Sequence, residues 1–258
     1  MTAIAIPARR RGARHWWHGF STMLRWEITR MRLLLPITIL VQAFTGAGLV
    51  LGIGIFFEVM DAERILYLST GSVVITLVAV GMVMGPQLVA EQRQTGQFDY
   101  MASLPVPRSA ATSAWIGLNV LIAVPGAVIA LVAASLRYDA QFSVSPILLP
   151  AVALILVGGA LIGYAYGTAI PEPRVVALVS QLLVFFIFGF SPIAYPATNL
   201  PAPLQTMHHW LPFEAMADLV RAGLTEGMVE SVTRPFLVLG AWTLAAGVVT
   251  IRTIGRRG

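Results

Sequence analysis

Long apolar runs alternate with short polar segments along this chain. Six runs contain no charged residue: 33–57, 65–90, 109–136, 140–171, 175–195 and 235–251. A helix needs about 20 apolar residues to cross the hydrocarbon core of a bilayer. Transmembrane β-strands would instead need segments of about ten residues in which apolar and polar positions alternate. Because these runs are long and do not alternate, they predict an all-α membrane protein with six transmembrane helices.

Three of the runs are unusual in length or position. The run 140–171 is too long for one span, and Pro146 and Pro150 predict that its helix begins near residue 146, which gives a span over 146–171. The run 235–251 is short and would extend only about 26 Å as a helix. The run 33–57 is longer than the apolar segment of a signal peptide and lacks an Ala-x-Ala site after it. We therefore expect it to be the first span.

The basic residues are distributed unevenly. The chain has 17 of them, all arginine. If the six runs cross the membrane, 13 arginines lie on the side that holds both termini. Four lie on the other side: Arg64, Arg137, Arg221 and Arg234. Since basic residues concentrate in cytoplasmic segments, we expect both termini in the cytoplasm and a multi-pass protein of the cell membrane. We therefore attribute the net charge of +5 to arginines that set the orientation in a lipid bilayer. For this reason we expect no nucleic-acid partner.

Composition supports the membrane interpretation and excludes several kinds of chemistry. Only 11% of the residues are charged and the mean hydropathy is +0.79, whereas soluble domains have about 25% charged residues. The absence of cysteine excludes disulfides, thiolate metal sites and cysteine nucleophiles. The absence of lysine excludes the phosphate-binding lysine of a P-loop. We expect a single transmembrane domain over residues 1–258 that is not an enzyme.

Residues 14–32 form an amphipathic pattern ahead of the first span. The apolar face of the predicted helix holds Trp16, Phe20, Met23, Leu24, Ile28 and Met31, and the opposite face holds Arg14, His18, Ser21, Arg25 and Arg32. Aromatic rings at headgroup depth beside arginines are typical of an interfacial helix. We expect this segment to anchor the protein at the membrane surface, and the alternative is a lever that presses on a cytoplasmic partner.

The inner connection, 91–108, has the composition of a short helix between two spans. Thr95 can N-cap it, Asp99 lies in its first turn, and Pro105 and Pro107 stop it. Its apolar face holds Phe98, Met101 and Ala102. Such a helix could dock into a groove of a soluble partner or rest on the membrane as part of a solvated turn. The pattern leaves both interpretations open.

The outer connection, 196–234, predicts a second helix that starts at Pro212. One face holds Phe213, Met216, Ala217, Val220 and Leu224, and the other holds Glu214, Asp218 and Arg221. We expect a helix that lies on the surface and caps the bundle, and the alternative is a lid over an outward exit. The segment is too short for a catalytic domain.

The spans offer few groups for chemistry. None contains Asp, Glu, His or Arg, which argues against a proton-driven transporter. The amides Gln42, Gln87, Asn119 and Gln181 more often join helices than bind substrates. Four rings crowd the fifth span: Phe185, Phe186, Phe188 and Phe190. They could form an apolar wall for an amphipathic substrate or simply face lipid. We take Gln42, Gln181, Phe185, Phe186 and Phe188 as candidates for a substrate path.

We expect neither a catalytic nor a metal site. Ser191 has no histidine in any span to act as its base, and the adjacent His208 and His209 lack an obvious third ligand. Gly159, Gly163 and Gly167 recur every four residues in the fourth span, which favours close helix packing.

Two motifs stand out in the connections. The inner motif consists of Glu91, Arg93, Gly96, Asp99, Leu104, Pro105, Val106 and Arg108. The outer motif consists of Tyr195, Pro196, Asn199, Leu200, Pro201, Leu211, Pro212, Asp218 and Arg221. On these two motifs, the chain resembles the permease subunits of type-2 ABC exporters, from about residue 20 to 251. Gln97 stands where the family usually has Thr, and no basic residue follows near Trp115. These two differences affect which subgroup of the family the chain resembles.

The resemblance implies a six-span permease that pairs with a second permease, identical or homologous, and with two copies of an ABC ATPase subunit. ATP and Mg²⁺ would bind to those ATPase subunits, and this chain would carry no cofactor. The ATPase-coupling residues would be Glu91, Arg93, Gly96, Phe98, Asp99, Leu104, Pro105 and Arg108. We expect export of hydrophobic or amphipathic small molecules, such as drugs or antibiotics. The alternatives are export of a lipid or polysaccharide and a membrane scaffold or assembly factor without transport.

Overall fold

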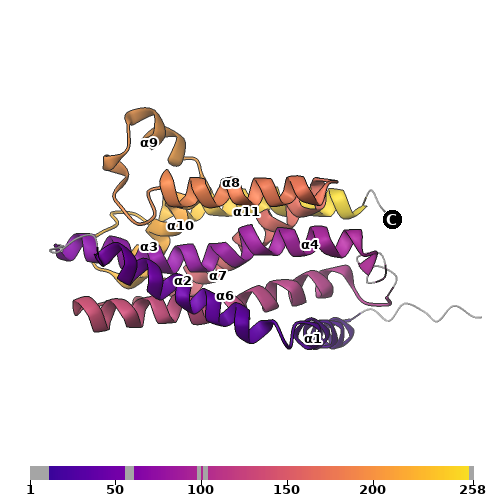
Figure 1. Cartoon of the computed structure of the whole chain (residues 1–258). Coiled ribbons are helices and arrows are strands. Elements are labelled where there is room, and N and C mark those ends of the chain that lie inside the picture. The colour runs from indigo at the N-terminus through magenta and orange to yellow at the C-terminus, as the bar shows by residue number, and fades with distance from the viewer. Residues whose placement is uncertain (1–11, 56–60, 98–99, 101–103, 256–258) are drawn as a thin grey trace, which may run out of the picture.

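The computed structural model describes residues 12–55, 61–97, 100 and 104–255, and these form helices without a strand. Five helical segments are long and apolar enough to cross a membrane. They are α2 (Leu35–Ile55), the continuous α3 (Ala62–Val78), η1 (Ala79–Met84) and α4 (Gly85–Gln94), then α6 (Arg108–Tyr138), α7 (Leu148–Ala169) and α11 (Thr233–Gly255). They run along a common axis (Figure 1), as expected for a multi-pass membrane protein.

The remaining apolar run, 175–195, forms the shorter helix α8 (Pro173–Gly189). Its 17 residues extend about 26 Å, slightly less than the ~30 Å hydrocarbon core. The prediction that this helix reaches residue 195 is wrong, because Pro192 follows closely and disfavours a helical conformation at Ser191. The prediction that the last span is the short one is also wrong, since α11 continues through Arg234 and Arg252 at its two ends.

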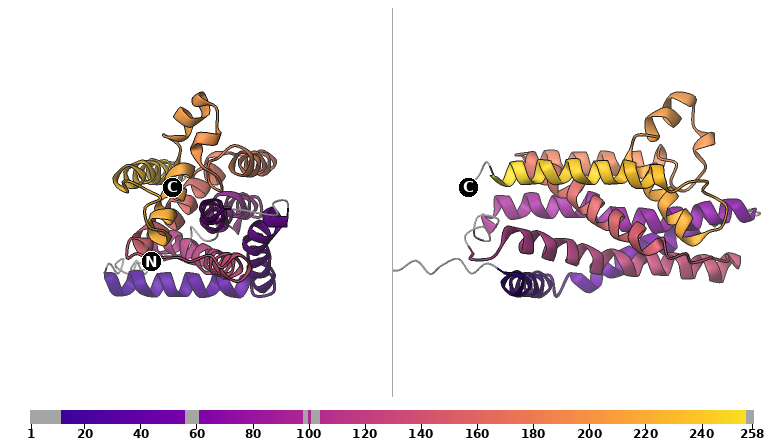
Figure 2. Two further views of the ribbon diagram at one scale, coloured as in Figure 1. Left: turned by 90° about the vertical axis from the view of Figure 1, so that its left-hand side faces the viewer. Right: turned by 180° about the vertical axis from the view of Figure 1, so that it is seen from behind.

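One end of the bundle holds most of the arginines that the structure describes. Helix α1 (Ala13–Arg30) lies across this end, roughly perpendicular to the other helices (Figure 2). The end of α4, the starts of α6 and α8 and the end of α11 lie there too (Figure 1). This α1 end holds Arg14, Arg25, Arg30, Arg32, Arg93, Arg108, Arg174 and Arg252. The opposite end holds Arg64, Arg137, Arg221 and Arg234, which is the segregation that the sequence predicts.

The helices α3–η1–α4 and α7 form the centre of the bundle. A Cβ atom at Gly163 of α7 would lie 1.9 Å from the carbonyl oxygen of Gly81, and one at Gly167 would lie 2.9 Å from Cα of Pro86. The two backbones are therefore in direct contact, which confirms the predicted close packing. At the same level η1 is a π-helix, and Tyr166 of α7 donates a hydrogen bond to the carbonyl oxygen of Met82 in η1.

The outer connection contains η2 (Ala197–Asn199), α9 (Ala202–His208) and α10 (Pro212–Leu224). Its last helix, α10, enters the bundle, whereas α9 protrudes from it (Figure 1). Nearly every residue of α10 is buried, on both its apolar and its polar face. Figure 1 shows α10 between α3, α7 and α11. The prediction that this helix is a surface-lying cap or a lid is therefore wrong, because α10 packs between other helices. We call this end of the bundle, opposite α1, the α10 end.

The contact between α7 and η1 gives a test of the fold. We expect Gly163→Ala to lower the free energy of unfolding by about 1–3 kcal/mol, because the new methyl group overlaps the Gly81 carbonyl. Gly247→Ala on α11 is the control, since a Cβ atom there meets nothing within 4 Å. The measurement is unfolding in mixed micelles titrated with denaturing detergent. Equal stability of the two variants would contradict this packing.

Candidate functional site

Glu91 and Arg93 belong to the last turn of α4, and not to a loop that starts at residue 91. The helix continues past these charges because their side chains can leave the apolar core while the backbone stays helical. Glu91 is exposed at the α1 end. Arg93 Nη1 donates hydrogen bonds to the carbonyl oxygens of Gly167, Thr168 and Ile170 at 3.3, 3.1 and 2.8 Å. Arg93 thus caps the C-terminus of α7, where the helix dipole favours a cation.

The chain turns sharply after α4. Thr95 is the C-cap of α4, so the prediction that it N-caps a following helix is wrong. Gly96 has a φ of +70°, a left-handed conformation that glycine adopts at little cost. Leu104 is half-buried, Pro105 is exposed, and Arg108 is the first residue of α6. The predicted Phe98, Asp99, Met101 and Ala102 lie outside the described residues.

Helix α1 is joined to the start of α6. A Cβ atom at Gly19 would lie 3.0 Å from Cγ1 of Val106 and 3.3 Å from Cδ of Pro107, so α1 crosses directly over this segment. The indole nitrogen of Trp16 donates a hydrogen bond to Ser109 Oγ at 3.0 Å. The predicted helix over residues 14–32 is therefore confirmed from Ala13 to Arg30, and it is packed onto the inner connection.

Arg30 extends this contact to the turn after α4. Its guanidinium pairs with the buried Glu27 at 2.9 Å and donates a hydrogen bond to Gln97 Oε1 at 3.0 Å. Burial raises the pKa of Glu27, and the charge of Arg30 opposes that rise. Arg30 therefore links α1 with the turn after α4. We call α1, the end of α4 and the start of α6 the inner platform.

The five candidate path residues do not share one pocket. Gln42 is buried where α2 crosses α6, and its backbone lies against Gly126. Gln181 and Phe185 are exposed on the outer face of α8. Phe186 packs on Phe213 of α10, with ring centroids 5.7 Å apart. Helix packing explains the positions of Gln42 and Phe186, and Gln181 and Phe185 lie on an exposed face of α8.

Phe188 lines a cavity of about 660 Å³ at the α10 end. The cavity lies between α2, α3, the end of α8 and the segment that follows it. Its lining consists of Ile53, Asp61, Glu63, Arg64, Tyr67, Leu68, Phe188, Ala194, Tyr195, Pro196 and Asn199. Tyr195, Pro196 and Asn199 belong to the outer motif, so the structure brings part of that motif to the cavity.

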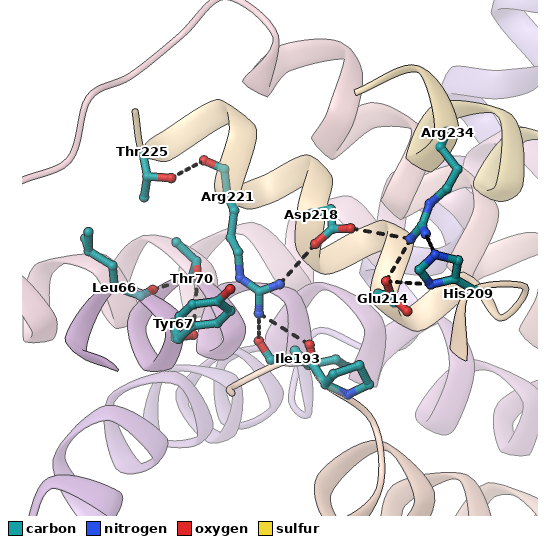
Figure 3. Close-up of polar contacts among 11 residues, drawn as sticks. Leu66, Tyr67, Thr70, Ile193, His209, Glu214, Asp218, Arg221, Thr225 and Arg234 are labelled. Carbon is teal, nitrogen blue, oxygen red and sulfur yellow. Dashed lines mark hydrogen bonds and ion pairs between the residues drawn. The ribbon is translucent and has the colours of Figure 1, made fainter. Parts of the chain in front are cut away.

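Asp218 and Arg221 of the outer motif belong to a polar cluster around α10 (Figure 3). Arg221 is only 3% exposed, and Nη1 lies 3.2 Å from Asp218 Oδ1. Nη2 donates hydrogen bonds to the carbonyl oxygens of Ile193 and, at 3.4 Å, Pro192. The guanidinium also lies 4.3 Å from the ring centroid of Tyr67. Arg221 thereby ties α10 to α3 and to the segment after α8.

A second arginine ties the same helix to α11. Arg234 Nη2 lies 2.7 Å from Glu214 Oε1 and 3.8 Å from Asp218 Oδ2. Arg234 also contacts the His209 ring, and His209 Nδ1 lies 3.3 Å from Glu214 Oε1. Two arginines thus balance two carboxylates, so the cluster carries no net charge when His209 is neutral. Burial raises the pKa of Asp218, and Arg221 opposes the rise, while burial lowers the pKa of Arg221.

Sequence reasoning found the polar face of α10 but not its burial. The i, i+4 and i+7 spacing of Glu214, Asp218 and Arg221 indicates one face, which is as typical of solvent exposure as of an ion-pair network. One feature of the sequence could have suggested burial. The face has two acids and one arginine, and Arg234 at the start of α11 supplies the second positive charge that balances them. In the part of the chain that the structure describes, no group of three His, Asp or Glu side chains is placed to hold a metal ion.

Comparison with known proteins adds no relative. No protein-family model matches the sequence, and no curated protein matches it significantly. Membership of the type-2 ABC exporter permeases therefore stays a prediction from the two motifs.

Removing Arg221 should be costly. We expect Arg221→Met to lower the free energy of unfolding by about 3–5 kcal/mol, because it leaves Asp218 and two carbonyl groups without their buried partner. Arg64→Met is the control, since the Arg64–Asp61 pair is mostly exposed and should contribute less than about 1 kcal/mol. Detergent-titrated unfolding measures both variants. Losses of the same size would contradict the central role of Arg221.

His208 should make the packing of α9 depend on pH. Its ring is fully buried and stacks on Phe186, with centroids 5.3 Å apart. Burial lowers the pKa of His208 below its usual 6.5, although Glu214 and the backbone of Phe190 oppose this. The neutral ring is thus favoured in the packed state. The stability it contributes is complete above pH 6.5 and declines as the pH falls toward the lowered pKa.

Hydrogen exchange of the α9 amides, corrected for intrinsic rates, measures this effect. We expect protection to decrease between about pH 7.5 and pH 5.5 in the unmodified chain and to stay constant in His208→Phe. His209→Gln, which removes the neighbouring exposed histidine, should retain the decrease. If His208→Phe also loses protection, another group is responsible.

Proposed function

We propose that this chain is the transmembrane permease subunit of an ATP-driven exporter of the type-2 ABC class, with hydrophobic or amphipathic small molecules as its substrates. It would act with a second permease, identical or homologous, and two copies of an ABC ATPase subunit. It would lie in the cell membrane with six spans, α8 being the fifth, and with both termini in the cytoplasm. Drug or antibiotic efflux is the form of export that we favour over lipid or polysaccharide export.

The observation that carries the proposal is the continuous helix from Ala62 to Gln94. Its C-terminal end presents Glu91 on the inner platform, and its N-terminal end lines the outer cavity through Tyr67 and Leu68. Arg93 joins the inner end to α7, and Arg221 joins the outer end to α10. A force applied at the inner platform can therefore reach the outer cavity through one element.

The charge distribution supports an energy source outside this chain. In the described apolar helices, charged residues lie only near the helix ends, and the buried charges of α10 are paired, Asp218 with Arg221 and Glu214 with Arg234 of α11. The sequence has no lysine for a P-loop. ATP binding by a partner can move the permease only if the inner platform makes different contacts in the two states of that partner. Glu91 is the exposed residue of the platform best placed to make such contacts.

The test is ATP-driven efflux by this chain reconstituted with the ATPase that co-purifies with it. We expect Glu91→Ala to reduce efflux at least about tenfold, as loss of ~1.4 kcal/mol of coupling would do, while the ATPase still co-purifies. Gln94→Ala, an exposed neighbour on the same turn, is the control and should keep efflux within about twofold.

Three outcomes would contradict the proposal. Normal efflux by Glu91→Ala would remove the coupling role of this residue. Uphill transport or nucleotide hydrolysis by the chain alone in pure lipid vesicles would remove the need for an ATPase partner. Stable assembly with an ATPase but no ATP-dependent efflux of any compound would favour the scaffold alternative.

A further inference from the structure

The outer cavity has the size and shape of a small-molecule site. Its volume of about 660 Å³ lies within the ~300–1,000 Å³ usual for ligand pockets. A smaller cavity of about 40 Å³ shares five of its lining residues, among them Leu68 and Phe188, and reaches Ser72 and Ile75, about one and two turns further along α3. The site therefore narrows from the α10 end into the bundle.

Apolar groups line one part of this cavity. Ile53 comes from α2, Leu68 from α3 and Phe188 from α8, so three helices contribute one apolar side chain each. Phe188 and Ile53 also line the smaller cavity. An apolar body of a ligand would be removed from water here, which is favourable in proportion to the apolar area buried.

Charged groups from the start of α3 form the rim. Asp61 and Arg64 are paired with each other, since Asp61 Oδ1 accepts a hydrogen bond from the Arg64 backbone N–H at 2.8 Å and Oδ2 lies 3.5 Å from Arg64 Nε. Glu63 forms no ion pair with a described residue. The three formal charges sum to −1, and the unmatched charge is that of Glu63. This rim is therefore complementary to a ligand with one positive charge.

Aromatic residues provide a second preference for a cation. Tyr67 of α3 and Tyr195, which follows α8, both line the cavity, and Phe188 lines this cavity and the smaller one. Aromatic rings attract cations through their negative faces, and the attraction strengthens where water is excluded. One face of Tyr67 is occupied by the Arg221 guanidinium, 4.3 Å from the ring centroid, so a ligand cation would meet Tyr195 and the remaining surface of Tyr67.

We propose that the outer cavity binds amphipathic monovalent cations, with the apolar body against Ile53, Leu68 and Phe188 and the charge near Glu63 and the tyrosines. That such cations are the exported substrates rests on the proposed function. The binding itself requires only this chain.

The experiment uses the purified full-length chain in lipid nanodiscs and measures saturable binding of radiolabelled tetraphenylphosphonium. Excess unlabelled compound defines the background from lipid. Tetraphenylborate has nearly the same shape and the opposite charge, so its own saturable binding, measured with labelled anion in separate samples, separates charge recognition from apolar bulk. We expect saturable binding of the cation and at least about tenfold weaker saturable binding of the anion.

Two matched pairs of variants locate the site. We expect Glu63→Gln to weaken binding about five- to tenfold and Glu230→Gln, an exposed acid at the same end outside the cavity, to change it less than twofold. We expect Phe188→Ala to weaken binding about three- to tenfold and Phe185→Ala, an exposed ring on the same helix, to change it less than twofold. Glu63→Asp keeps the charge and should retain most of the affinity.

Several results would overturn the inference. They are the absence of saturable cation binding to the unmodified chain, equally strong saturable binding of the anion, and equal effects of the cavity variants and their controls. Because both probes are measured on the unmodified chain, their comparison does not depend on whether any variant folds. If the cation binds as described and ATP-driven efflux is absent, the proposed function fails and this site remains. If efflux is present without saturable cation binding, only this inference fails.

Discussion

The contact on which the structure depends most is the direct approach of two backbones, at Gly81 of η1 and Gly163 of α7. Between helices in a membrane, van der Waals packing replaces much of the hydrophobic driving force, and small residues allow the closest approach. This contact places the helix 62–94 in the centre of the bundle, with the other spans around it. Because Tyr166 satisfies the Met82 carbonyl at the same level, the π-helical turn is held in place.

Charges at the two ends of that central helix have different tasks. At the α1 end, Arg93 and Arg30 hold the inner platform together while Glu91 stays exposed. At the α10 end, Arg221 and Arg234 neutralise two carboxylates of a buried helix, so α10 can pack among the spans without unpaired charge. A buried pair is costly to break from one side. The polar contacts at the α10 end are therefore costly to break. The α1 end is the one that would contact a partner in the proposed function, through the exposed Glu91.

The proposed transport function follows from the connection between these ends. An inner surface able to contact a soluble partner and an outer cavity able to hold an amphiphile lie on one continuous helix. The apolar faces of α2, α8 and α11 are exposed, and in the proposed assembly they would contact lipid and the second permease. The proposed cation site adds a chemical preference that the resemblance to type-2 ABC permeases does not supply, because it is inferred from the unmatched charge of Glu63.

The sequence by itself determined the number and approximate limits of the apolar runs, the amphipathic helix near the N-terminus and the segregation of arginines. These features are local, since hydropathy and periodicity act over tens of residues at most. Helix ends were less predictable, as at Gly189 and Gln94, because a helix can continue past a charge or stop before an apolar run ends. Only the tertiary structure decided the burial of α10, the capping of α7 by Arg93 and the lining of the cavity. Each of these joins residues far apart in the chain, such as Arg93 and Gly167, and no pattern along the sequence records which distant partner a side chain meets.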